Sequence, residues 1–256
     1  MLRIDIISVQ PQMFRGFLEE SIVARAVKKG ACTINIVDLR DFGEGKWKKV
    51  DDKPYGGGPG MLMKCAPWFA AVESCGAATR TILTSPAGKT FCQRDAEELA
   101  ACDHLVFMCG HYEGFDARVE TLATDRYSLG DFVMTGGELA AAAMTDAIVR
   151  LLPGVLGGGA AATSSESFSH GGILEAPQYT HPPEFRGMKV PEVLLSGDHA
   201  KIEAWRKSAA RRLTEQHRPD LLSTDGLRPH SDARRRFNRF PTPIWTPPTA
   251  TQPRAN

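Results

Sequence analysis

The sequence predicts an α/β fold in which a parallel β-sheet is covered by helices. Four short runs are rich in β-branched or large apolar residues and end at turn-forming residues, at 2–9, 33–39, 79–85 and 104–110. Two segments with a helical spacing of apolar residues, 17–29 and 92–102, lie between these runs. The alternation favours a parallel sheet, because neighbouring parallel strands are joined by crossovers that are usually helical.

The rest of the chain falls into three kinds of segment. A helix is predicted over 138–152, and Pro153 and Gly154 end it. Residues 157–173 are mostly small and polar and predict a flexible linker, which in a compact protein is often functional. After about residue 225 the chain is rich in Pro and Arg and poor in apolar residues, which predicts a poorly ordered tail.

A second, basic helix is predicted within the C-terminal part. Asp198 is its expected N-cap. Its apolar stripe favours the core of a small domain over a surface that stacks on RNA, and it consists of Ile202, Trp205, Ala209 and Leu213. We therefore predict a sheet domain, a linker, a small mostly helical domain and a tail, over residues 1–156, 157–173, 174–225 and 226–256.

Composition predicts a cytoplasmic protein, and its charge is distributed unevenly along the chain. Apolar residues make up 42% of the 256 residues, enough for a packed core. No stretch is long and apolar enough to cross a membrane, the N-terminus lacks a secretory signal pattern, and the six cysteines form no CxxC pair. The net charge is +1, yet residues 201–256 hold twelve Lys or Arg against five Asp or Glu. A polyanion contact and a solubilising tail both explain this asymmetry.

Two phosphate-binding patterns in the sequence are incomplete. SPAGKT at 85–90 contains the Gly-Lys-Thr of a P-loop, but the Gly required five residues before Gly88 is Leu83. VDLRDFGEG at 37–45 contains Gly43 and Gly45 without the third Gly of the dinucleotide fingerprint. A nucleotide-hydrolysing loop and a Rossmann-type methyltransferase are therefore disfavoured.

Four glycine-rich clusters lie beside predicted strand ends, where open parallel sheets bind ligands. They are DDKPYGGGPGM at 51–61, SPAGK at 85–89, CGHYEGFD at 109–116 and YSLGDFVMTGGEL at 127–139. Glycine lets main-chain N–H and C=O groups approach a ligand with no Cβ in the way. A tight turn explains any one cluster, but four of them favour a cradle for a neutral heterocycle.

The strings DDKPYGGGPGM, CGHYEG, SLGDFVMTGGEL and VLLSGDHAKIEAWR closely resemble the bacterial tRNA (guanine-N1)-methyltransferases of the SPOUT superfamily, up to about Leu222. The resemblance implies an α/β domain with a deep trefoil knot, a rare exception to the rule against knots. It implies a homodimer with a composite active site. It also implies methyl transfer from S-adenosylmethionine to N1 of the guanosine immediately 3′ of the anticodon of tRNA, and it allows Mg²⁺ only as a non-structural activator.

The resemblance assigns S-adenosylmethionine to three loops. Pro86 is in the first loop, and Gly110, Tyr112 and Glu113 are in the second. The third loop supplies Leu129, Gly130, Asp131, Phe132, Val133, Met134, Gly136 and Gly137. Gly57, Gly58 and Gly60 match a loop near the target base, and Lys201 and Arg206 are expected to contact tRNA phosphates. The less favoured alternative is that Tyr112 is a core residue and Glu113 a solvated loop acid.

Methylation of guanine at N1 requires a base for the N1 proton and a group that faces the charge developing on the guanine oxygen. The family's base is the Asp of a segment that ends Asp-Ser-Phe, and here 165–168 is Ser-Glu-Ser-Phe, so Glu166 takes this place. Arg150 matches the family arginine at the guanine oxygen, and its alternative is an ion pair with Asp146. His181 and Trp47 also depart from the family pattern, at positions expected to affect tRNA contacts.

Two other functions stay open on the sequence. The difference at Glu166 is consistent with an RNA-binding protein that keeps the fold and has lost transfer. The third reading is a P-loop hydrolase, which requires triphosphate turnover that depends on Lys89. Binding of S-adenosylmethionine together with a methyl-transfer assay on tRNA separates these functions.

Overall fold

A computed structural model describes residues 1–158, 163, 166–169 and 172–222. The chain forms two compact units, Met1–Ser164 and Ser165–Asn256, and each is described by itself. The boundary between them falls within the segment 157–173. The predicted tail over 226–256 lies outside the described residues.

The first unit contains a five-stranded parallel sheet. Its strands are β1 (Leu2–Ser8), β2 (Cys32–Asp38), β5 (Arg80–Thr90), β6 (His104–Cys109) and β7 (Asp125–Ser128), in the spatial order β2-β1-β6-β5-β7. Every neighbouring pair is parallel, which confirms the predicted sheet. The central strand β6 is buried along its whole length, as expected for an apolar run covered on both faces.

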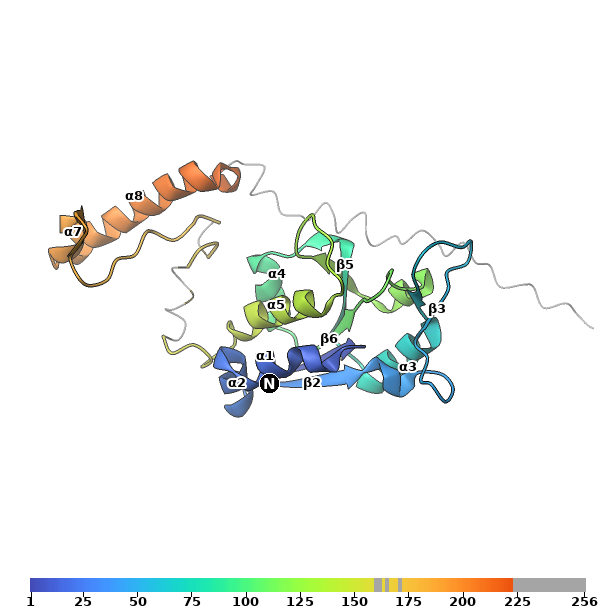
Figure 1. The fold of residues 1–256 in the computed structure, drawn as a ribbon. Coiled ribbons are helices and arrows are strands. Elements are labelled where there is room, and N and C mark those ends of the chain that lie inside the picture. The colour runs from blue at the N-terminus through green and yellow to red at the C-terminus, as the bar shows by residue number, and fades with distance from the viewer. Residues whose placement is uncertain (159–162, 164–165, 170–171, 223–256) are drawn as a thin grey trace, which may run out of the picture. The chain divides into compact units, whose positions relative to one another are not determined.

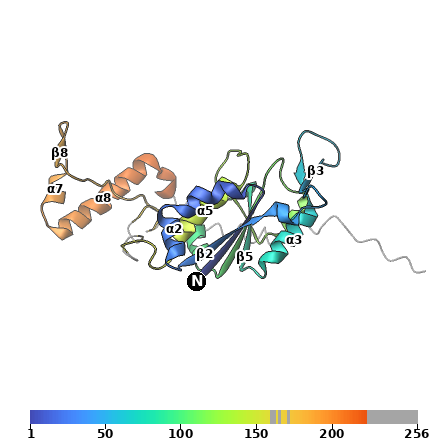
Figure 2. The same ribbon diagram turned by 60° about the horizontal axis from the view of Figure 1, so that its bottom comes forward.

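Helices cover both faces of this sheet (Figures 1 and 2). One face carries α1 (Arg15–Glu19), α2 (Ser21–Lys28), α4 (Gln93–Ala100) and α5 (Glu138–Val149), and the other carries α3 (Cys65–Cys75) with the 3-10 turns η2 (Leu39–Phe42) and η3 (Ala117–Leu122). Side chains alternate between the two cores. Ile82 and Phe107 enter the first core, and Leu83 and Met108 enter the second.

Several predicted element bounds were wrong. The helix predicted over 17–29 is interrupted, because Glu20 between α1 and α2 has an extended backbone. The strand predicted over 79–85 continues to Thr90, and α5 ends at Val149 instead of residue 152. The sequence patterns did not predict α3 or β7. β7 is only four residues long and begins with two charged side chains, so it carries little strand signal.

Smaller elements flank the sheet. The 3-10 turn η1 (Pro11–Phe14) follows β1, and the short antiparallel strands β3 (Asp51–Asp52) and β4 (Leu62–Met63) bracket the first glycine cluster. Pro67 lies in the first turn of α3, where the missing N–H costs no hydrogen bond. Among the described helices, none is long and apolar enough to cross a membrane.

The described part of the second unit is organised around α8 (His199–His217). The carboxylate of Asp198 accepts a hydrogen bond of 3.2 Å from the N–H of Lys201, which confirms the predicted N-cap. Ala209 is buried, whereas the other three residues of the predicted stripe are half-buried, and the ring of Trp205 lies 6.3 Å from that of Tyr179. The predicted packing of this face is therefore confirmed only in part. The other described elements are α7 (Glu192–Leu195), η4 (Pro219–Leu222) and the hairpin of β8 (Glu184–Phe185) and β9 (Met188–Lys189).

Candidate active site

The first glycine-bearing loop at the carboxyl edge of the sheet is a bulge within β5. Thr84 and Lys89 both pair with Tyr127 of β7, so residues 85–88 loop out of the ladder. Pro86 is exposed in this bulge. It belongs to the first of the three loops predicted to bind the methyl donor S-adenosylmethionine, which are called the donor loops below. Gly88 lies against the main chain of β7, because a Cβ there would come within 2.6 Å of the nitrogen of Tyr127. The bulge therefore needs glycine where it crosses the neighbouring strand.

The second and third donor loops are joined through their main chains. The N–H of Gly137 donates a hydrogen bond of 2.7 Å to the carbonyl of Gly110, and His111 and Gly136 form an antiparallel bridge. A Cβ on Gly137 would overlap Thr84 Oγ1 and lie 3.0 Å from the nitrogen of Gly110. Gly137, the N-cap of α5, thus packs against the ends of β5 and β6, and only glycine fits there because it has no Cβ.

The third loop presents main-chain groups and two exposed side chains. The hydroxyl of Ser128 makes two hydrogen bonds to the main chain of Gly130. It donates to the carbonyl of Gly130 at 2.9 Å and accepts from the N–H of Gly130 at 3.1 Å. Leu129 and Met134 pack against the core. Phe132 and Val133 are 56% and 85% exposed, and Asp131 is also exposed. The loop is therefore anchored at both ends and open in the middle.

The glycine cluster assigned to the target base lies against the second donor loop. Gly57, Gly58 and Gly60 all have positive φ angles, which explains the requirement for glycine in this turn. A Cβ on Gly60 would lie 2.8 Å from Cδ of Glu113. The N–H of Glu113 donates to the carbonyl of Met61 at 3.0 Å. The structure thus brings together two groups of residues that the sequence analysis assigned to different ligands.

An ion pair fixes the end of the second donor loop. The N–H of Asp116 donates 2.9 Å to the carbonyl of Met63, and its carboxylate accepts from the guanidinium of Arg118 at 2.7 and 2.8 Å. The hydrogen bonds from Arg118 hold the pKa of Asp116 well below its usual range. Burial, with a further contribution from Asp116, raises the pKa of the Cys65 thiol. The loop therefore ends at a charge that stays ionised.

Three polar residues beneath these loops were missed. Glu138, the first residue of α5, is 1% exposed, and it accepts a hydrogen bond of 2.7 Å from Ser8 Oγ at the end of β1. His111 Nδ1 lies 3.7 Å from Glu138 Oε2. An acid at the start of the apolar run ELAAAAM is the signal that the sequence offered, since such a residue needs a partner when buried.

Lys89 of the incomplete P-loop pattern has a structural partner. Its ammonium group pairs with the buried carboxylate of Asp95, which also accepts from the N–H of Cys92 at 3.0 Å and caps α4. Burial raises the pKa of Tyr127, which donates to the same carboxylate at 3.4 Å. Lys89 therefore stabilises the start of α4 through Asp95, which disfavours its role as the phosphate-binding lysine of a P-loop hydrolase.

The remaining predicted residues lie on other elements. Arg150 is the C-cap of α5, in the first unit. Glu166 is in the second unit, where its carbonyl accepts from the N–H of Ser169 at 3.1 Å. Lys201 pairs with Asp198 at 3.0 Å, whereas Arg206 has no ion pair among the described residues. Trp47 is 86% exposed at a tight turn.

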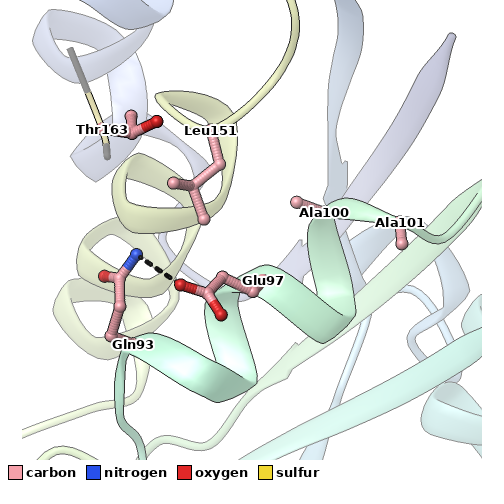
Figure 3. Close-up of a pocket in the computed structure, with 6 residues that line it drawn as sticks. All are labelled: Gln93, Glu97, Ala100, Ala101, Leu151 and Thr163. Atoms are coloured by element: carbon pink, nitrogen blue, oxygen red, sulfur yellow. Dashed lines mark hydrogen bonds between the residues drawn. The ribbon is translucent and has the colours of Figure 1, made fainter. Parts of the chain in front are cut away.

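A shallow hollow of about 350 Å³ lies elsewhere in the first unit. It is lined by Gln93, Glu97, Ala100, Ala101, Leu151 and Thr163 (Figure 3). Gln93 Nε2 donates to Glu97 Oε1 at 3.4 Å across one turn of α4. None of the predicted donor, base or tRNA contacts lines this hollow. In the part of the chain that the structure describes, no three His, Cys, Asp or Glu side chains gather as a metal-ligand set.

The fold and the arrangement of the loops define an α/β protein whose predicted ligand-binding loops meet at the carboxyl edge of a parallel sheet. Residues 2–224 match the tRNA (guanine-1)-methyltransferase TrmD family. The chain is 52% identical to the tRNA (guanine-N(1)-)-methyltransferase of Levilactobacillus brevis, over 88% of this chain and 91% of the relative. It is 52% identical to that of Geobacillus kaustophilus, over 86% and 91%. The chain belongs to this family, and it transfers a methyl group to N1 of a guanine in tRNA.

Proposed function

We propose that this methyltransferase takes its methyl group from S-adenosylmethionine and places it on the guanosine immediately 3′ of the anticodon. The observation that carries the proposal is the contact of four loops at one edge of the sheet. Three of these loops are the predicted donor loops, and the fourth is the base loop that lies against Glu113. Donor and acceptor that are held side by side lose little further entropy on reaction, which supplies much of the rate enhancement.

The donor loops have the character that this molecule needs. Gly88, Gly136 and Gly137 lie so close to neighbouring segments that a Cβ on any of them would overlap another atom. Loops of this kind expose main-chain donors and acceptors, which suit the polar edge of adenine and the methionine end of the donor. The exposed rings of Tyr112 and Phe132 add apolar surface. When bound, S-adenosylmethionine supplies an electrophilic methyl group on a positively charged sulfur.

The chain's own residues handle the proton and the charge of the guanine. In this proposal the carboxylate of Glu166 accepts the N1 proton, which leaves the N1 electron pair available for the new N–C bond. Loss of the proton places negative charge on the guanine oxygen, and the guanidinium of Arg150 faces that oxygen. The role of Glu166 as the base is tested by its substitution with Gln.

The finer architecture is part of the same proposal. The proposal includes a deep trefoil knot, and the close approach of Gly137 to the ends of β5 and β6 supports it. A homodimer with a composite site gives a partner to the exposed side chains of Val133 and Leu139, which are 85% and 59% exposed. Lys201 and Arg206 of α8 contact tRNA phosphates. The enzyme acts in the cytoplasm, with Mg²⁺ only as a non-structural activator.

Two measurements on the full-length chain test the proposal. Isothermal titration measures binding of S-adenosylmethionine, and transfer of a labelled methyl group is followed on a tRNA transcript with G immediately 3′ of the anticodon. The matched substrate has A at that position. We expect donor binding and transfer only to the G transcript. A folded chain that does not bind the donor, or that methylates both transcripts equally, contradicts the proposal.

A further inference from the structure

Glu138 and His111 form an unsatisfied polar pair beneath the donor loops. Glu138 Oε2 and His111 Nδ1 are both buried, face each other at 3.7 Å, and lack a hydrogen-bond partner among the described residues. The side chain of Glu138 is 1% exposed and that of His111 is 22% exposed. A buried polar atom without a partner costs free energy, so its retention in a fold calls for a physical reason.

The pair joins three segments of the proposed donor site. Glu138 begins α5 and holds Ser8 at the end of β1 through its other oxygen, at 2.7 Å. His111 follows β6 and bridges to Gly136. A Cβ on Gly136 would lie 2.7 Å from His111 Nδ1 and would overlap Glu138 Oε2. Glycine at 136 is what allows the third donor loop to pass over the pair.

The histidine ring also contacts the exposed donor residue Tyr112. The two rings meet edge to face, with centroids 5.0 Å apart and planes at 87°. Tyr112 has a backbone φ of 58°, which residues other than glycine rarely adopt. The main-chain N–H of His111 donates to Met63 Sδ at 3.2 Å, and its main-chain carbonyl accepts from the N–H of Gly114 at 3.1 Å. The turn closed by the His111 carbonyl and the ring contact with His111 therefore both favour this strained conformation of Tyr112.

We propose that His111 and Glu138 are a positioning pair that sets the donor-binding conformation of the second and third loops. The pair tightens into a hydrogen bond when the donor is bound, and it acts on the donor through Tyr112 and Gly136. This inference rests on the proposed donor site and deepens it, because it names residues that place the contacting groups without touching the donor. Loss of the pair therefore raises the Kd for the donor more than it lowers kcat, the rate of methyl transfer in the bound complex.

The molecule supplies a matched control. Asp5 and His104 form a second buried histidine–carboxylate pair between β1 and β6, with His104 Nε2 2.7 Å from Asp5 Oδ2. His104 is at the amino end of β6, whereas His111 follows its carboxyl end. Asp5→Asn thus perturbs another buried histidine–carboxylate pair of the same sheet, at the opposite end of β6 from the predicted donor loops.

The test compares Glu138→Gln, His111→Gln, the double variant and Asp5→Asn. Thermal melting measures stability, titration with S-adenosylmethionine measures Kd, and steady-state transfer gives kcat with separate KM values for donor and tRNA. We expect each single variant at the pair to raise the donor Kd and donor KM about tenfold, a typical coupling between contacting residues. The double variant should be no worse than either single variant, and KM for tRNA should be unchanged. Asp5→Asn should lower the melting temperature and leave the donor Kd at the wild-type value.

The outcomes are separable. Variants of the pair that melt lower but bind the donor as the wild type does overturn the inference, as does donor affinity that falls equally in Asp5→Asn. If Glu138→Gln does not fold, His111→Gln decides alone, since its side chain is less buried. A wild-type chain that does not bind the donor overturns the proposed function itself. If the wild type binds the donor and the variants of the pair bind it equally well, only the positioning role is overturned.

Discussion

The backbone of Gly60 lies directly against the side chain of Glu113, with room for a hydrogen atom and none for a methyl group. A Cβ on Gly60 would lie 2.5 Å from Glu113 Oε1, and the φ of Gly60 is 77°. Gly57, in the same cluster, has a φ of 79° but nothing within 4 Å of its missing Cβ. The two glycines share the same backbone requirement, and only Gly60 also adjoins the donor loop.

This difference predicts separate effects for two similar substitutions. Gly60→Ala and Gly57→Ala should each cost about 1–2 kcal/mol, because alanine is strained in the left-handed region. Gly60→Ala should also weaken donor binding, since it displaces Glu113, and Gly57→Ala should leave donor affinity near the wild-type value. Titration with S-adenosylmethionine and thermal melting check both. Equal donor affinity in the two variants would show that the base loop and the donor loop act independently.

Gly137→Ala should be destabilising for steric reasons alone. Its φ of −85° suits any residue, but a Cβ would overlap Thr84 Oγ1 and lie 3.1 Å from Cα of Cys109. Forcing a methyl group into such a contact typically costs about 1–3 kcal/mol, so we expect a lower melting temperature and weak donor binding. Gly157→Ala is the control, because nothing lies within 4 Å of its missing Cβ. A Gly137→Ala variant as stable as Gly157→Ala would contradict the close packing of Gly137 against Thr84 and Cys109.

Glu166→Gln should abolish most methyl transfer and spare donor binding. Removal of a general base typically slows a reaction about 10²–10⁴-fold. Glu166→Asp is the matched control, because it keeps the carboxylate that the family has at this place. Single-turnover transfer to tRNA and the donor Kd are the two measurements. Activity of the Gln variant within about tenfold of the wild type would remove Glu166 from the role of base.

Asp116 should make stability fall on acidification. Its pKa is lower in the folded chain than its usual value, chiefly because the side chain of Arg118 donates to it. A group of this kind stabilises the fold above its unfolded pKa of about 3.9, and the contribution is lost as the pH falls towards the folded value. Melting temperatures from neutral pH to about pH 3 should therefore fall more steeply for the wild type than for Asp116→Asn. Parallel curves would show that the ion pair contributes nothing to stability.

Arg206 should contribute to the salt dependence of tRNA binding. It has no ion pair among the described residues, whereas Lys207 pairs with Glu203 at 3.3 Å on the same helix. If Arg206 contacts a phosphate, Arg206→Ala should reduce the slope of log Kd against log salt concentration by about 0.7–0.9. Lys207→Ala should change that slope less. An unchanged slope in Arg206→Ala would place the docking surface elsewhere.

The sequence by itself determined the class of fold, because local patterns carry that information. The apolar runs at β1, β2 and β6 and the capping Asp198 depend on neighbours in the chain, and the structure confirms them. The long glycine-rich strings identified the family for the same reason, since each string is contiguous. Weak local signals failed, as with β7, whose pairing with β5 and not its own composition makes it a strand.

Only the tertiary structure decided which residues meet. Gly60 and Glu113, or His111 and Glu138, are far apart in the sequence, and nothing in their local patterns indicates that they are in contact. The fit of Gly137 against Thr84 and Cys109 depends on where β5 and β6 end side by side, which is a property of the packed sheet. A buried acid such as Glu138 reads as a surface residue in the sequence, because burial is decided by the elements that close over it.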